Sequence, residues 1–211
     1  QPSSDFDLKR LETIVPLVEK DIADKKLPGA VVLVGREDRV VWQKAIGNRA
    51  LVPAPEKMTI ATIFDVASLT KVVATNTAMM ILIEEGKVRL SDRVATHIPG
   101  FERYNKGGIT VRHLMTHMSG LRPDVDLGDM WTGYDKAIEL AIVEVPTAPP
   151  GEQFVYSDIG YFLLGEIVRR VSGQPLNEFT RDRIFKPLGM VDTGFLPPAG
   201  RTAPARCRPV P

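Results

Sequence analysis

Residues 68–71 read Ser-Leu-Thr-Lys, and they open an apolar run that continues to Ile83. Residues three apart on a helix lie on one face, so a helix that begins near Ser68 would bring the Lys71 amine beside the serine hydroxyl. A serine needs a neighbouring base to act as a nucleophile at neutral pH, and burial together with nearby positive dipoles would lower the pKa of Lys71 towards the neutral amine. A solvated helix start would explain the same four residues. The apolar run, however, predicts a buried helix that ends before Gly86.

The composition bounds the classes of protein that the chain can belong to. Its 211 residues are 44% hydrophobic and 25% charged, with a net charge of +1, so composition offers no argument for a nucleic-acid or anionic-membrane partner. No apolar run reaches the ~20 residues of a membrane-spanning helix. The single Cys207 excludes an internal disulfide and a multi-cysteine metal site. The chain starts at Gln1, which would fit a removed secretory signal; we predict a periplasmic or secreted protein, with a cytoplasmic location left open.

Hydrophobic periodicity divides the chain into early strands and a long helical region. Apolar residues at helical spacing predict a first helix over 5–26, which Pro16 would kink. Two β-rich runs at 30–35 and 39–47 form a hairpin, and residues 48–58 read as a loop. The helices expected after Ser68 lie at 111–118 with Thr110 as N-cap, at 134–143, at 158–173 with Asp158 as N-cap, and from Pro175 to about Phe185. Two or three strands are marginal without partners, so we expect part of the sheet to be missing from this chain.

The sequence Tyr156-Ser157-Asp158 stands between a Pro/Gly breaker cluster and the helix that follows. A tyrosine on such a loop could point into a cleft, and a phenol near an ammonium ionises more easily. Tyr156 could then shuttle a proton between Ser68, Lys71 and a leaving group. A half-buried anchoring tyrosine would fit the same position.

Four blocks of the sequence carry a resemblance to a known family. They are FDVASLTK (64–71), HLMTHMSGL (113–121), PPGEQFVYSDIGYFLLGEIV (149–168) and KPLGMVDTGF (186–195). In this order they resemble the serine β-lactamase and penicillin-binding superfamily, on the class C branch that also includes D-alanyl-D-alanine carboxypeptidases and family VIII carboxylesterases. The resemblance runs from about Leu27 to Phe195. It implies an α/β (α+β) fold of the β-lactamase/transpeptidase type, with an antiparallel sheet flanked by helices plus a helical region.

The resemblance also implies a role for each residue of the site. Ser68 would be the acylated nucleophile, and its backbone N–H would supply half of the oxyanion hole. Lys71 would be the immediate proton acceptor, while Tyr156 would assist deprotonation and protonate the leaving group. Asp158 stands where many members carry Asn. A carboxylate only accepts hydrogen bonds, so Asp158 would contact the substrate region, hold Lys71 in its charged form and favour neutral esters over anionic β-lactams.

A third motif of the family, Lys-Thr-Gly or a His-x-Gly variant on a strand, does not occur here in a usable place. It would supply the other oxyanion N–H. We therefore expect the N-terminal portion of such an enzyme, without the closing strands. Its expected parts are an N-terminal helix and first strands over 1–60, a helical region over 61–196, and a Pro/Arg-rich connection over 197–211. A longer chain or a second chain would supply the missing part of the sheet.

Other candidate residues have competing explanations. His113 and His117 are four apart, as in a zinc-binding His-Glu-x-x-His motif, but Leu114 stands where that chemistry needs Glu. We expect a packed helix in which His117 bonds locally, and we predict neither a metal nor a cofactor. Trp131 and Tyr134 could line a substrate cleft or cap the core.

The sequence thus predicts a serine hydrolase that works through an acyl-enzyme on Ser68. A small-molecule ester, a β-lactam or a D-amino-acyl peptide would suit the same machinery. One alternative is a slow-turnover β-lactam-binding protein or D-alanyl-D-alanine peptidase. The other, which the missing third motif favours, is a non-catalytic fragment or binding module.

Overall fold

The computed structural model describes residues 6–125 and 131–196, and the chain divides into two compact units between Asp65 and Val66. The predicted connection at 197–211 lies outside the described residues. Within the described ranges, none of the helices combines the length and apolarity that crossing a membrane requires.

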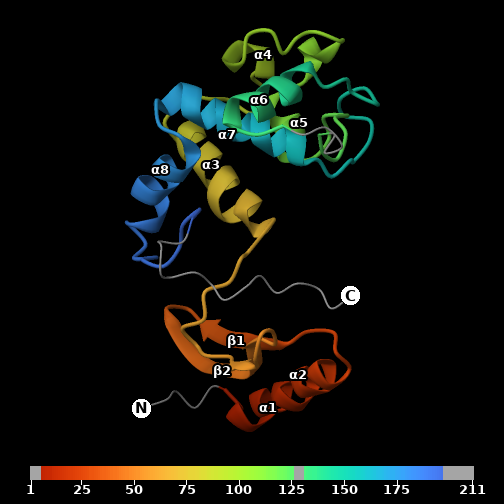
Figure 1. Ribbon diagram of the computed structural model, residues 1–211. Coiled ribbons are helices and arrows are strands. Elements are labelled where there is room, and N and C mark those ends of the chain that lie inside the picture. Colours follow the sequence, from red (N-terminus) through yellow and green to blue (C-terminus); the bar gives the residue numbers. More distant parts are fainter. Residues whose placement is uncertain (1–5, 126–130, 197–211) are drawn as a thin grey trace. The chain divides into compact units, whose positions relative to one another are not determined.

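The first unit is a small antiparallel sheet with two helices beside it (Figure 1). The predicted hairpin is present, but its link is only Glu37 and Asp38, because Arg36 ends the first strand and lies opposite Arg39. The stretch 48–58 is not a loop throughout, because it holds the end of the second strand and a short third strand. The strands are β1 (Gly29–Arg36), β2 (Arg39–Ala50) and β3 (Glu56–Lys57), in the order β1-β2-β3.

The single helix predicted over 5–26 is two helices, α1 (Leu8–Glu12) and α2 (Ile14–Ala23). The break falls at Thr13 and not at Pro16, because Pro16 occupies the first turn of α2, where a missing N–H breaks no helical hydrogen bond. Neither helix contains a buried residue. The apolar residues that are buried in this unit lie in β2 and just after β3: Trp42, Ile46, Ala50 and Met58.

The second unit is helical and is built around α7 (Asp158–Ser172) (Figure 1). This helix packs against α3, α4, α5, α6 and α8. All but one of the residues from Ile159 to Val168 are buried, as expected of a helix enclosed on most sides. The surrounding helices are η1 (Lys71–Asn76), α3 (Thr77–Glu84), α4 (Val94–His97), η2 (Lys106–Gly108), α5 (Val111–Met115), α6 (Tyr134–Val143), α8 (Leu176–Thr180) and η3 (Arg181–Phe185).

Most helix boundaries follow the predicted capping signals. Gly86 and Gly173 adopt φ of 70° and 75° just beyond α3 and α7, where a left-handed residue ends a helix. Thr110 caps α5 as predicted, and the His113 side chain completes a capping box. The α5 helix ends at Met115, earlier than predicted, because His117 has a φ of 57°.

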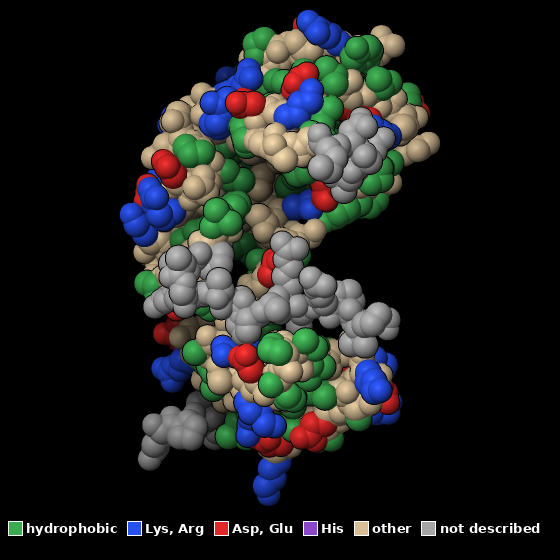
Figure 2. All heavy atoms as spheres, viewed as in Figure 1, with side chains coloured by type: hydrophobic (Ala, Val, Ile, Leu, Met, Phe, Trp, Pro, Cys, Tyr) green, Lys and Arg blue, Asp and Glu red, His purple; other side chains and the backbone are tan. Residues whose placement is uncertain are grey.

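The surface carries charges of both signs. On the face drawn in Figure 2, Lys and Arg side chains are interspersed with Asp and Glu side chains in both units. Several form ion pairs, such as Lys20–Asp24 at 3.0 Å and Lys136–Glu139 at 3.0 Å. This distribution matches the net charge of +1.

Candidate active site

Ser68 lies on an exposed turn directly before the first helical residues of the second unit. The residue before it, Ala67, has a φ of 43°, which is uncommon for a residue with a side chain. The helix then runs as the π-helix η1, so the continuous α-helix predicted from Ser68 to Ile83 is wrong over Lys71–Asn76. Backbone strain and π-helical turns both concentrate at functional sites.

The Lys71 amine contacts both Ser68 and Asp158, as the sequence analysis expects. Its Nζ donates to Ser68 Oγ at 3.2 Å and lies 2.5 Å from Asp158 Oδ1. Burial works to lower the pKa of Lys71, but hydrogen bonds with Asp158 and then Tyr156 outweigh it and raise the pKa above its ordinary value. Burial favours the neutral amine that a proton acceptor needs, whereas the Asp158 carboxylate favours the ammonium form, as its place in the sequence led us to expect. The role of Lys71 as proton acceptor stays a prediction.

The Tyr156 phenol is the group whose proton the site loosens. Hydrogen bonding with Ser68, and then with Lys71, lowers the pKa of Tyr156 below its ordinary value. The Lys71 Nζ lies 4.9 Å from the centroid of the tyrosine ring. The lowered pKa of Tyr156 and the raised pKa of Lys71 make Tyr156 a candidate proton acceptor for Ser68, and that role stays a prediction.

The N-cap of α7 is Ser157 and not Asp158, which corrects the prediction. The Ser157 hydroxyl accepts from the Gly160 N–H at 3.3 Å and donates to the Arg122 carbonyl at 2.6 Å. Because Ser157 satisfies the helix end, the Asp158 carboxylate is available to pair with Lys71.

His117 belongs to the site, and the sequence analysis missed it. Its bond is not local, since the Ser157 N–H donates to His117 Nδ1 at 3.0 Å across 40 residues of sequence. Its ring stacks on Tyr156 with centroids 4.4 Å apart. His113 instead completes the cap of α5, so the two histidines do not share one helix face. The available signal was the HLMTHMSGL block, in which His117 is the second histidine.

A cavity of about 570 Å³ in the helical unit is lined by Ser68, Lys71 and Asp158. Most of the remaining lining is apolar or aromatic and includes Ala137, Ile138, Phe162, Leu176, Phe195 and Tyr134. The Tyr134 hydroxyl donates to the buried Glu166 at 2.6 Å. Trp131 packs against the hydrophobic core and is not among the described residues that line this cavity; its contact with substrate stays a prediction.

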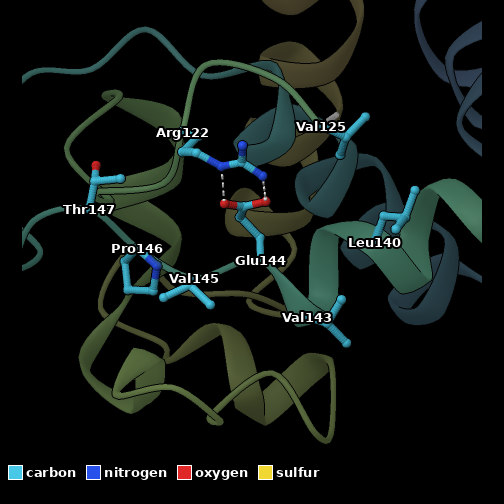
Figure 3. Close-up of a pocket in the computed structure, with 8 residues that line it drawn as sticks. All are labelled: Arg122, Val125, Leu140, Val143, Glu144, Val145, Pro146 and Thr147. Atoms are coloured by element: carbon cyan, nitrogen blue, oxygen red, sulfur yellow. Dashed lines mark hydrogen bonds and ion pairs between the residues drawn. The ribbon is translucent and has the colours of Figure 1, made fainter. Parts of the chain in front are cut away.

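A second cavity, of about 450 Å³, lies near the end of α6 (Figure 3). Arg122 and Glu144 line it and are joined by two hydrogen bonds of 2.5 and 2.8 Å. The other lining residues are Val125, Leu140, Val143, Val145, Pro146 and Thr147. The paired charges compensate each other, and this lining contains no serine, lysine or tyrosine comparable to the Ser68 site.

The fold and this site define a class: a β-lactamase-like protein in which a serine at a helix start meets a lysine and a tyrosine. The Beta-lactamase family model matches residues 14–209, so the chain belongs to that family. The predicted fold is thereby confirmed, with three strands in the described part of the sheet.

Three similar proteins illustrate the family. The N-acetylmuramyl-L-alanine amidase of Bacillus subtilis is 34% identical over 215 residues, which cover 92% of this chain and 48% of the relative. The structure of the β-lactamase/D-alanine carboxypeptidase of Yersinia pestis is 26% identical with a TM-score of 0.77, covering 93% of this chain and 58% of that one. EstCE1, a hydrolase with promiscuous acyltransferase activity, is 25% identical with a TM-score of 0.79, covering 96% and 60%. The chain spans about half the length of the curated relatives it matches.

Proposed function

We propose that this protein is a serine hydrolase that forms an acyl-enzyme on Ser68. The observation that carries the proposal is the meeting of the Ser68 hydroxyl, the Lys71 ammonium and the Tyr156 phenol in one site. The names of the similar proteins, an amidase, a β-lactamase/carboxypeptidase and an acyltransferring hydrolase, all describe reactions at an acyl carbon.

In the proposed mechanism, the Tyr156 phenolate takes the Ser68 proton while Oγ attacks the substrate carbonyl carbon. The Ser68 N–H, at the start of a helix, would donate to the developing oxyanion. As the tetrahedral intermediate collapses, the phenol protonates the leaving group and the acyl-enzyme remains. The Tyr156 phenolate then deprotonates a water that attacks the acyl carbon, and as the acyl–Oγ bond breaks the phenol returns this proton to Ser68 Oγ, which releases the acid and restores both residues. Throughout, Lys71 stabilises the phenolate and Asp158 holds Lys71 in place.

A neutral ester with an apolar acyl group is the substrate class that the cavity supports best. Lys71 and Asp158 compensate each other's charge, and the cavity beside them is mainly apolar. An apolar acyl group would therefore enter without leaving a charge uncompensated. β-Lactams and D-amino-acyl peptides are the second candidates, supported by the printed names of the relatives.

We also propose that the third motif and the closing strands come from a longer chain or from a second chain. The supporting observation is that the chain spans only about half the length of its curated relatives. The class C branch, the division at residues 60 and 196, and a periplasmic or secreted location stay predictions.

The test is covalent labelling followed by intact mass measurement. The chain is pulsed with a p-nitrophenyl ester and, separately, with a cephalosporin, and the adduct is mapped to a peptide. We expect one adduct, on Ser68, and its complete loss in Ser68→Ala. Ser119→Ala is the matched control, because Ser119 is a buried serine outside the cavity. Labelling that persists in Ser68→Ala would refute the nucleophile, and a wild-type chain that no reagent labels would support the non-catalytic alternative.

A further inference from the structure

We propose that His117 is a positioning residue that holds the Tyr156 phenol against Ser68 and Lys71. The inference rests on the proposed function only in that the reaction needs Tyr156; the contacts of His117 do not depend on it. In this proposal His117 takes no direct part in the proton transfers; it acts through its contacts with Tyr156 and with the chain on either side of Tyr156.

The first observation is that His117 bonds both neighbours of Tyr156. The Val155 N–H donates to the His117 carbonyl at 2.9 Å, and the Ser157 N–H donates to His117 Nδ1 at 3.0 Å. One residue therefore holds the backbone before and after the tyrosine. The loop that carries the phenol cannot shift without breaking at least one of these bonds.

The second observation concerns the ring itself. The His117 and Tyr156 rings are stacked, with centroids 4.4 Å apart and planes inclined by 30°. Phe154 meets the edge of the imidazole at 5.8 Å, and Tyr161 lies 5.1 Å from it. Tyr156 is 45% exposed, and the stacked imidazole is a contact that limits rotation of the phenol ring.

The third observation is that this arrangement needs a neutral imidazole. Nδ1 accepts from Ser157, so the ring proton sits on Nε2. Burial, and then the charge of Lys71, lower the pKa of His117, while Asp158 acts in the opposite direction. The titratable groups near the ring are Lys71, Asp158, Tyr156 and Tyr161. A proton on Nδ1 would face the Ser157 N–H and add a second cation near Lys71, which would displace Tyr156.

The backbone conformation at position 117 limits which side chains can replace His117 in a test. His117 has a φ of 57°, a left-handed conformation that Asn, Asp and His adopt more readily than other residues with side chains. Asn also carries an acceptor oxygen close to the position of Nδ1. His117→Asn therefore keeps the backbone and the acceptor but removes the stacked ring, whereas His117→Phe keeps a ring and removes the acceptor.

The experiment measures the ionisation of Tyr156 in the 211-residue chain by tyrosinate absorbance. Tyr156 is one of four tyrosines, so each titration is compared with the same variant carrying Tyr156→Phe. We expect both His117 variants to raise the Tyr156 midpoint towards the ordinary value of about 10. The control is His97→Gln, because the His97 ring bonds Asp92 at 3.2 Å and contacts no site residue named above. A Tyr156 midpoint that is unchanged in both His117 variants would overturn the proposal.

Two further measurements separate this inference from the proposed function. Labelling of Ser68 by the p-nitrophenyl ester should slow roughly ten- to hundredfold in the His117 variants, as expected when a reacting group is misplaced. If the wild-type chain is not labelled at all, the proposed function fails, and the tyrosinate titration still decides the role of His117. If the variants do not fold, histidine NMR of the wild type decides: we expect Nε2 protonated and Nδ1 bare at neutral pH, and a proton on Nδ1 would overturn the proposal.

Discussion

Two glutamates with similar partners show how differently the two units are packed. In the sheet unit, Glu12 accepts from Trp42 Nε1 at 3.0 Å and pairs with Lys44 at 3.1 Å. In the helical unit, Glu166 accepts from a tyrosine hydroxyl and from two arginines. The Glu12 side chain is 49% exposed and that of Glu166 is 1% exposed. The helical unit buries the carboxylate of its polar network, whereas the sheet unit leaves its own carboxylate in contact with solvent.

The two units also differ in how far their apolar residues are buried. The central helix α7 buries nearly all of its middle turns, while α1, α2 and β1 contain no buried residue. The helical unit can therefore hold Ser68, Lys71 and Tyr156 by its own packing. The sheet unit leaves apolar side chains such as Leu33 and Val40 exposed.

The two tryptophans allow each unit to be followed separately. Trp42 lies in β2 and Trp131 packs against the core of the helical unit. A Trp131→Phe background leaves fluorescence from the sheet unit, and a Trp42→Phe background leaves fluorescence from the helical unit. Denaturant unfolding in these two backgrounds serves the three predictions that follow.

Truncating a leucine in each unit should produce the largest contrast. Leu164→Ala in α7 removes a side chain that is 0% exposed and should lower the free energy of unfolding of the helical unit by about 4 kcal/mol. Leu33→Ala in β1, where the leucine is 54% exposed, should cost less than about 0.5 kcal/mol in the sheet unit. Similar losses for the two variants would contradict the difference in packing.

Removing the two glutamates should give the next largest difference. Glu166→Ala leaves Arg169, Arg170 and the Tyr134 hydroxyl without their buried acceptor, and we expect a loss of about 3 kcal/mol in the helical unit. Glu12→Ala should destabilise the sheet unit much less, because water screens exposed charges. An equal effect of the two substitutions would show that the sheet unit shields Glu12 more than the structure indicates.

Low pH should reduce the free energy of unfolding of the helical unit by protonating Glu166. This is the smallest of the three predicted effects on stability. Burial acts to raise the pKa of Glu166, but hydrogen bonds from Arg169, Tyr134 and Arg170 lower it from 4.5 to about 2. A carboxyl with a lowered pKa stabilises the fold above its unfolded-state pKa, and that stability is lost as the pH falls through the folded-state value. We expect the helical unit to lose about 2 kcal/mol between pH 4.5 and pH 2. Glu166→Gln should remove this part of the pH dependence, and an unchanged slope in that variant would contradict the assignment.

Local signals explain most of what could be predicted about the fold. The hairpin of the first two strands, the cap at Thr110 and the glycines after two helices depend on residues close in sequence. The helix break at Thr13, the short third strand and the π-helix after Lys71 were not predicted. The geometry of these three segments depends on residues that lie near them in space, and hydrophobic periodicity along the chain does not describe such contacts.

At the candidate site, the sequence by itself was enough to point to the family and to the residues expected to react. The spacing of Ser68 and Lys71, the position of Tyr156 and the four family blocks pointed to a β-lactamase-like hydrolase, and the family match bears that class out. A three-residue spacing in a helix start and an ordered set of motifs are properties of the chain alone.

Only the tertiary structure decided how those residues are held against one another. Ser157 caps α7 and Asp158 pairs with Lys71. Hydrogen bonding with Asp158 raises the pKa of Lys71, while hydrogen bonding with Ser68 and Lys71 lowers the pKa of Tyr156. His117 reaches this group across 40 residues. A pKa and a hydrogen bond of this kind depend on distance, burial and charge in three dimensions, so they follow from the packing of the helical unit and not from the order of its residues.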